Sequence, residues 1–129
     1  MELTEKERLL LVEKKKQIQK LTAEILEIME DQKQAKRIKK KITNILSILS
    51  VIGSYVKSKD YNLRLFSLMA EEIFEELNNQ LLKEDLFVHF TVKKIEEFCI
   101  YVNSIQFDFT RKDLKIIFPK IDLSIFRAR

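Results

Sequence analysis

The sequence predicts an all-α protein: a long N-terminal helix or helical hairpin of coiled-coil type, then a small Phe-rich helical bundle, with a short two-stranded C-terminal element as an option. The 129 residues include one Gly and one Pro, too few for the hairpin turns of a β-sandwich or barrel. Tyr55 is the only one of the Phe and Tyr residues that precedes position 60. Aromatic side chains fill compact cores, whereas two-stranded helical seams use Leu, Ile and Val. We therefore expect an extended helical arm over residues 1–59 and a compact helical domain over residues 60–129.

The first helix is expected to begin at Thr4. Thr4, followed three residues later by Glu7, forms a capping box, and Glu5 adds a carboxylate to the first turn, where the helix dipole favours it. The apolar residues that follow at heptad spacing are Leu11, Ile18, Leu21, Ile25 and Ile28.

A second apolar stripe is offset from the first by three residues. Its members are Ile38, Ile42, Ile45, Leu49, Ile52 and Val56. Two structures fit the offset: one continuous, locally overwound helix from Thr4 to Val56, or two helices folded back as a hairpin. We favour the continuous helix, because no Gly or Pro separates the stripes and the residues between them favour helix.

A long helix of this kind cannot bury its apolar stripe alone, so it implies a partner. The side chains expected to form this partner or self-association seam are Ile18, Leu21, Ile25, Ile28, Ile42, Ile45 and Leu49. Small residues at Ser47, Ser50, Gly53 and Ser54 predict a close crossing between this helix and the compact half, with a ligand or membrane contact as the alternative. The apolar stretch 42–56 is shorter than the roughly 20 residues of a membrane-spanning helix, and we expect it to be buried in protein.

The compact half contains two further amphipathic patterns, with Asp60 as the expected N-cap of one helix and Thr91 as that of the other. Their apolar stripes are Leu63, Phe66, Ala70, Ile73, Leu77 and Leu81, then Val92, Ile95, Phe98, Cys99, Val102 and Ile105. Thr110 is expected to begin a short helix that Pro119 ends. Apolar and other residues alternate over 105–109 and over 121–125, which indicates extended segments; the two segments could pair as short strands.

Three features could carry chemistry, and each has a plainer explanation. His89, the one histidine, has Asp85 four residues earlier, but no further metal ligand is near in sequence. Cys99 lies on an apolar stripe, which raises rather than lowers a thiol pKa. The glutamates Glu71, Glu72, Glu75 and Glu76 lack the histidine companion of a di-iron helix and are expected to form a solvated acidic face. We therefore expect no enzymatic activity, no catalytic residue, no metal and no cofactor.

A basic run is the best functional lead. It comprises Lys33, Lys36, Arg37, Lys39, Lys40 and Lys41. Residues 1–41 contain 12 basic and 8 acidic side chains, residues 42–103 contain 6 and 9, and residues 104–129 contain 6 and 3. Basic ends around an acidic middle can bind polyanions, or bind copies of the same chain.

The sequence therefore predicts a non-enzymatic helical protein for interaction or assembly, acting as scaffold or adaptor through coiled-coil contacts. The expected partner is a second copy, preferably in a dimer, or another helical protein, with neither a membrane nor a small-molecule substrate indicated. The alternative is a nucleic-acid-binding accessory or regulatory protein that contacts phosphates through residues 33–41. The apolar C-terminal tail, residues 116–126, is expected to pack on its own domain, a second copy or another protein. The lone cysteine and the absence of a signal-like N-terminus favour a cytoplasmic protein, with the nucleus as the alternative.

Overall fold

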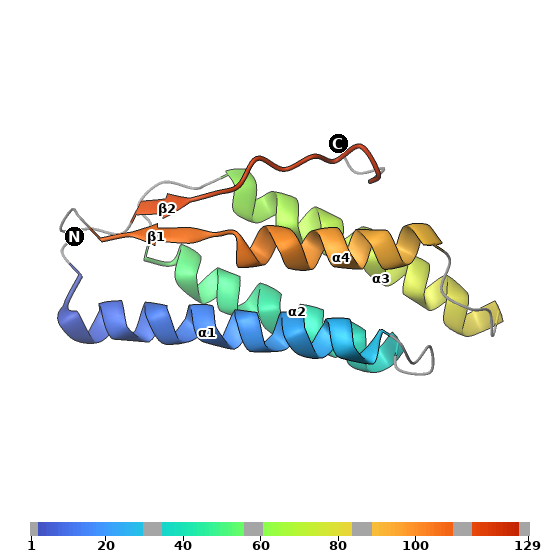
Figure 1. Ribbon diagram of the computed structural model, residues 1–129, viewed down its shortest axis with the longest axis horizontal. Coiled ribbons are helices and arrows are strands. Elements are labelled where there is room, and N and C mark those ends of the chain that lie inside the picture. Colours follow the sequence, from blue (N-terminus) through green and yellow to red (C-terminus); the bar gives the residue numbers. More distant parts are fainter. Residues whose placement is uncertain (1–2, 30–34, 56–60, 84–88, 110–114, 127–129) are drawn as a thin grey trace.

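The computed structural model describes residues 3–29, 35–55, 61–83, 89–109 and 115–126, with the backbone alone at 61–62, 80–83 and 89–90. Its four helices are α1 (Glu5–Ile28), α2 (Ala35–Gly53), α3 (Tyr61–Lys83) and α4 (His89–Asn103). Each helix packs against the next along the chain, and α1 also packs against α4, so the four helices form a closed bundle (Figure 1). The strands β1 (Gln106–Asp108) and β2 (Lys115–Ile117) form an antiparallel hairpin that continues from α4. The predicted all-α architecture with a short two-stranded element is confirmed.

The N-terminus of α1 has the predicted capping box. The Glu7 backbone N–H donates to Thr4 Oγ1 at 3.1 Å, and the Thr4 backbone N–H donates to Glu7 Oε1 at 3.0 Å. These bonds satisfy two backbone donors that a helix start otherwise leaves to solvent.

The favoured continuous helix is wrong, and the hairpin alternative describes the structure. Helix α1 ends at Ile28, α2 begins at Ala35, and the two run side by side (Figure 1). The residues between them, 30–34, lie outside the described residues. The three-residue offset of the two stripes explains the result, because one straight helix would turn the stripes to different sides, whereas two helices can turn both toward one core. Tertiary packing of an apolar face decides helix ends more strongly than local propensity.

Both N-terminal stripes therefore pack inside the chain. Ile25, Ile42 and Ile45 are fully buried, in one cluster with Phe66 and Phe98. The two phenyl rings meet edge to face with centroids 6.2 Å apart. The predicted boundary between an arm and a compact domain falls at residues 56–60, outside the described residues.

The close crossing predicted from small residues occurs at Gly53. A Cβ atom built on Gly53 would lie 2.9 Å from Leu63 Cδ1 of α3, so the missing side chain lets α2 and α3 approach. The other predicted small residues, Ser47, Ser50 and Ser54, are exposed.

Three local predictions in the compact half need correction. Helix α4 begins at His89, and Thr91 is a fully buried residue within it instead of its N-cap. Residues 115–117, expected in a short helix, form β2, because two β-branched isoleucines pair with β1 and bury Ile116. The partner of β1 is thus β2 and not the segment 121–125. The expected caps Asp60 and Thr110 lie outside the described residues.

The C-terminal tail packs on its own bundle. Phe126 is 1% exposed and belongs to the core. The Tyr101 hydroxyl on α4 accepts a hydrogen bond from the Asp122 backbone N–H at 3.1 Å and donates to the Asp122 carbonyl at 3.3 Å. The tail thus closes the bundle beside α4 (Figure 1).

The predicted acidic face of α3 is only half solvated. Glu71 and Glu75 are exposed, but Glu72 is buried. Lys94 of α4 lies 3.4 Å from the Glu72 carboxylate and 3.0 Å from that of Glu76. Helices α3 and α4 therefore contact each other partly through a buried lysine between two carboxylates, with the Phe126 ring 5.9 Å from the Lys94 ammonium.

Replacing Lys94 with Met should destabilise the fold by about 3 kcal/mol, because it removes the cation from between two carboxylates that have little access to water. Urea unfolding followed by circular dichroism measures the loss. Lys93→Met removes an exposed charge one residue away and should change stability by less than about 0.5 kcal/mol. Equal effects of the two substitutions would contradict a buried ion-pair role for Lys94.

Candidate functional site

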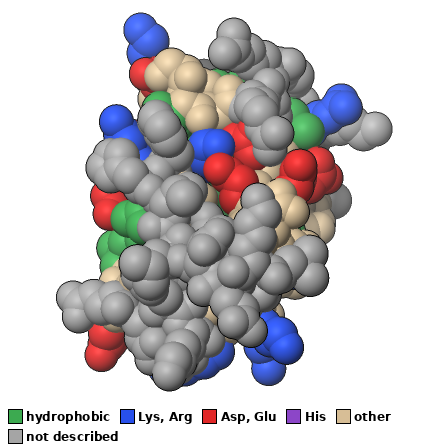
Figure 2. All heavy atoms as spheres, turned by 90° about the vertical axis from the view of Figure 1, so that its right-hand side faces the viewer, with side chains coloured by type: hydrophobic (Ala, Val, Ile, Leu, Met, Phe, Trp, Pro, Cys, Tyr) green, Lys and Arg blue, Asp and Glu red, His purple; other side chains and the backbone are tan. Residues whose placement is uncertain are grey.

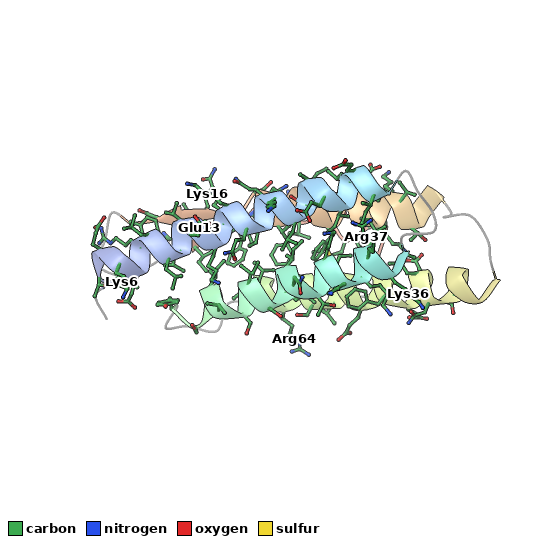
Figure 3. The ribbon with its side chains drawn as sticks, turned by 90° about the horizontal axis from the view of Figure 1, so that it is seen from below. Lys6, Glu13, Lys16, Lys36, Arg37 and Arg64 are labelled. Carbon is green, nitrogen blue, oxygen red and sulfur yellow. The ribbon has the colours of Figure 1, made fainter. Side chains whose placement is uncertain are left out.

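The exposed cations of α2 form the candidate site. We call Lys36, Arg37 and Lys40, all exposed, the basic face of α2. Residues 35–53 include no Asp or Glu, so no carboxylate of the same helix neutralises these charges. Figure 3 shows Arg37 on the side of α2 toward α1, and Lys36 on the side toward α3.

The structure divides the predicted basic run. Lys39 Nζ donates to Asn78 Oδ1 of α3 at 2.8 Å and lies 5.7 Å from the centre of the Phe74 ring. Lys41 Nζ donates to Glu24 Oε2 of α1 at 2.5 Å. These two lysines hold α2 against its neighbours, and Lys33 lies outside the described residues.

A groove between α1 and α2 borders the basic face. Its volume is about 420 Å³. The lining side chains are Gln17, Lys20, Leu21, Glu24, Asn44, Ser47 and Ile48. Two of these side chains are aliphatic and the other five are polar or charged, so the groove can hold charged groups.

Glu24 is surrounded by cations from both helices. The hydrogen bond from Lys41, together with the charges of Lys41, Lys20 and Arg37, holds the pKa of the Glu24 carboxyl below its ordinary value. The carboxylate thus stays ionised at neutral pH and offsets one of these charges. Lys20 is a member of the site that sequence reasoning missed, because its place beside α2 follows from the hairpin register and not from any local motif.

The polar residues farther along α2 differ in what they can offer a ligand. The Thr43 hydroxyl donates to the Lys39 carbonyl at 2.9 Å, and the Ser47 hydroxyl donates to the Thr43 carbonyl at 3.2 Å. Their protons are used within the helix, so these oxygens are left as acceptors. Asn44 is exposed and its amide can donate. Donors to an anion are therefore concentrated in the first two turns of α2.

The residues of the predicted seam lie within the bundle. Ile18, Ile25, Ile42, Ile45 and Leu49 are buried by the chain's own helices. The remaining two, Leu21 and Ile28, are partly buried against the same core. The burial expected from a partner is thus supplied by α2, α3 and α4.

The remaining candidates for chemistry have little support from their surroundings. Cys99 is buried, and desolvation raises the pKa of its thiol to about 12, with a further contribution from the charge of Glu96. Asp85 and the His89 side chain lie outside what the structure describes. Among the described residues, no three His, Cys, Asp or Glu side chains come together as a metal site.

Comparison of this chain with protein-family models, with curated proteins and with solved structures finds no match. Within the described residues, none of the helices is both long enough and apolar enough to cross a membrane.

Native protein should react with iodoacetamide at Cys99 at least about a hundredfold more slowly than urea-unfolded protein at pH 8, because the buried thiol stays protonated. Unfolding returns the pKa of the thiol toward 9.0 from about 12. Deprotonation of Cys99 therefore favours the unfolded chain. The free energy of unfolding should fall as the pH rises from about 9 to 12. An exposed thiol from Ser67→Cys is the positive control; equal labelling rates at the two positions would show that Cys99 is accessible.

Proposed function

We propose that this chain is a non-enzymatic protein that binds the phosphate backbone of a nucleic acid on the basic face of α2. One observation carries the proposal: α2 presents three cations to solvent and has no acidic residue of its own. Such a face attracts the phosphates of a nucleic acid, since each contact with a cation releases condensed counterions.

The arrangement of the cations supports backbone contacts more than base recognition. Lys36 and Lys40 are one helical turn apart, about 6 Å along the axis, and Arg37 lies between them on the side toward the α1–α2 groove (Figure 3). No aromatic side chain belongs to α2, so stacking on unpaired bases has no platform there. We therefore expect binding with little sequence preference.

The assembly mechanism predicted first has less support. It required Ile18, Ile25, Ile42 and Ile45 on an exposed seam, and these side chains are buried in the bundle. A polyanion, in contrast, needs only charges that are already at the surface.

The triple variant Lys36→Gln, Arg37→Gln, Lys40→Gln should weaken binding to a fluorescent 20-base-pair DNA at least about tenfold at 50 mM salt, because it removes three phosphate contacts. Fluorescence anisotropy measures the affinity. The matched control, Lys93→Gln, Lys115→Gln, Lys120→Gln, lowers the net charge equally at exposed positions on α4, β2 and the tail. It should change the affinity less than about threefold; equal losses in the two variants, or no binding by the unsubstituted chain, would refute the site.

The salt dependence gives an independent check. Three phosphate contacts to duplex DNA predict a slope of about −3 in a plot of log affinity against log salt concentration. The same titration on the triple variant should give a slope near zero. A slope that is unchanged by the substitutions would mean that other residues hold the phosphates.

A further inference from the structure

A second heptad stripe runs along the outward side of α1. Its members, spaced alternately by four and three residues, are Glu5, Leu9, Val12, Lys16, Gln19, Ala23 and Leu26. All seven are exposed, and of the large apolar ones Leu9 is 63%, Val12 is 40% and Leu26 is 43% exposed. The side chains of α1 that are buried in the core of the bundle lie on a different side of the helix and include Leu11, Ile18 and Ile25.

We propose that this stripe is a dimer interface, on which α1 packs antiparallel against α1 of a second copy of the chain. The heptad spacing is that of helices in two-stranded coiled coils. From Leu9 to Leu26 the pattern along the stripe is palindromic, with apolar residues at both ends and Lys16 and Gln19 in the middle. In an antiparallel register where paired residue numbers add up to 35, Leu9 meets Leu26 of the second copy. Val12 then meets Ala23, and Lys16 meets Gln19.

The charges on one flank of the stripe fit the same register. Lys6, Glu13, Lys20 and Glu27 recur every seven residues with alternating sign, and all four are exposed. In an antiparallel pair this flank faces the same flank of the other copy. Glu13 then lies beside Lys20 of the second copy, and Lys6 lies beside Glu27. The two-fold axis repeats both pairs, so four contacts between opposite charges form and no like charges are brought together on this flank.

A parallel arrangement fits the residues poorly. It would place Lys16 directly against Lys16 in the seam, and two like charges at such close range cost free energy. One lysine in the seam also favours a single register, because any slip moves it against an apolar residue.

The charge pattern on α1 favours a second copy of the chain as the partner of the stripe. The flank has two cations and two anions in alternation, so a strongly acidic or strongly basic partner helix would meet repulsion at every other position. The opposite flank belongs to the chain's own hairpin: Arg8 and Lys15 lie over the rings of Phe109 and Phe107 at 5.8 and 5.9 Å. The outward stripe between the flanks stays exposed along α1, where Figure 3 shows Lys6, Glu13 and Lys16.

The interface is small, since Leu9 to Leu26 spans about 26 Å of helix. We therefore expect a dimer that dissociates in the micromolar range and not an obligate one. Sedimentation velocity over about 1 μM to 1 mM protein should show a concentration-dependent shift from 15.4 kDa to twice that mass.

A charge swap tests the partner and the register. Glu13→Lys alone should raise the dissociation constant of the dimer about tenfold, because symmetry makes two attractive pairs repulsive. Adding Lys20→Glu should restore it to within about threefold of the original value. Glu71→Lys, an exposed reversal on α3, should have no effect. Circular dichroism should show an unchanged fold throughout, since all the substituted positions are exposed.

Cysteine pairing tests the direction. Oxidising a mixture of Val12→Cys and Ala23→Cys chains should give the mixed disulfide, because these positions share a layer. Val12→Cys alone should not cross-link, since its two copies are 11 residues, about 16 Å, apart along the helix. A monomer at every concentration, a dimer that Glu13→Lys leaves unchanged, or rapid cross-linking of Val12→Cys with itself would each overturn the proposal.

Discussion

The antiparallel packing of α1 on α2 is the contact on which the rest of this molecule depends. It brings two isoleucine stripes into one core, at Ile18 and Ile25 of α1 and Ile42 and Ile45 of α2. Removing such side chains from water is the main favourable free-energy term available to a chain of this size. The same register brings Lys41 to Glu24, so a local ion pair accompanies a much larger apolar contact. Once α1 and α2 are fixed, the sides that they turn to solvent are fixed too.

The two proposed surfaces are thus consequences of how the core is built. The basic face of α2 and the outward stripe of α1 are what remains after both helices have turned their isoleucines inward. The flank of α1 that contains Glu13 and Lys20 is also the one nearer α2, because Lys20 lines the groove between the two helices. In the proposed dimer this flank meets its own copy, so both α2 helices lie on one side of the assembly. Two basic faces would then be available to a single polyanion.

Local features of the sequence were predictable, whereas long-range ones were not. The capping box at Thr4 and the burial of Cys99 follow from residues close in sequence, and both are present. No Gly or Pro lies between α1 and α2, so the three-residue offset of the two apolar stripes was the one feature of the sequence that indicated two separate helices. Lys94 had no recognisable signal, because its carboxylate partners on α3 are 18 and 22 residues away. In the candidate site, the charges of α2 were predictable. That Lys39 and Lys41 bind to side chains of α3 and α1 was not, because those contacts depend on tertiary packing.

Thr22 of α1 and Asn103 of α4, 81 positions apart in the chain, are joined by a hydrogen bond in which Asn103 Nδ2 donates to Thr22 Oγ1 at 2.9 Å. Among the described residues, the three other main helix–helix contacts of the ring join helices that are consecutive in the chain, and shorter loops cost less entropy to close. The α1–α4 contact is the one that turns an open row of helices into a ring. Of the four contacts in the ring, it joins the helices that are farthest apart along the chain, so its formation has the largest loop-closure entropy cost.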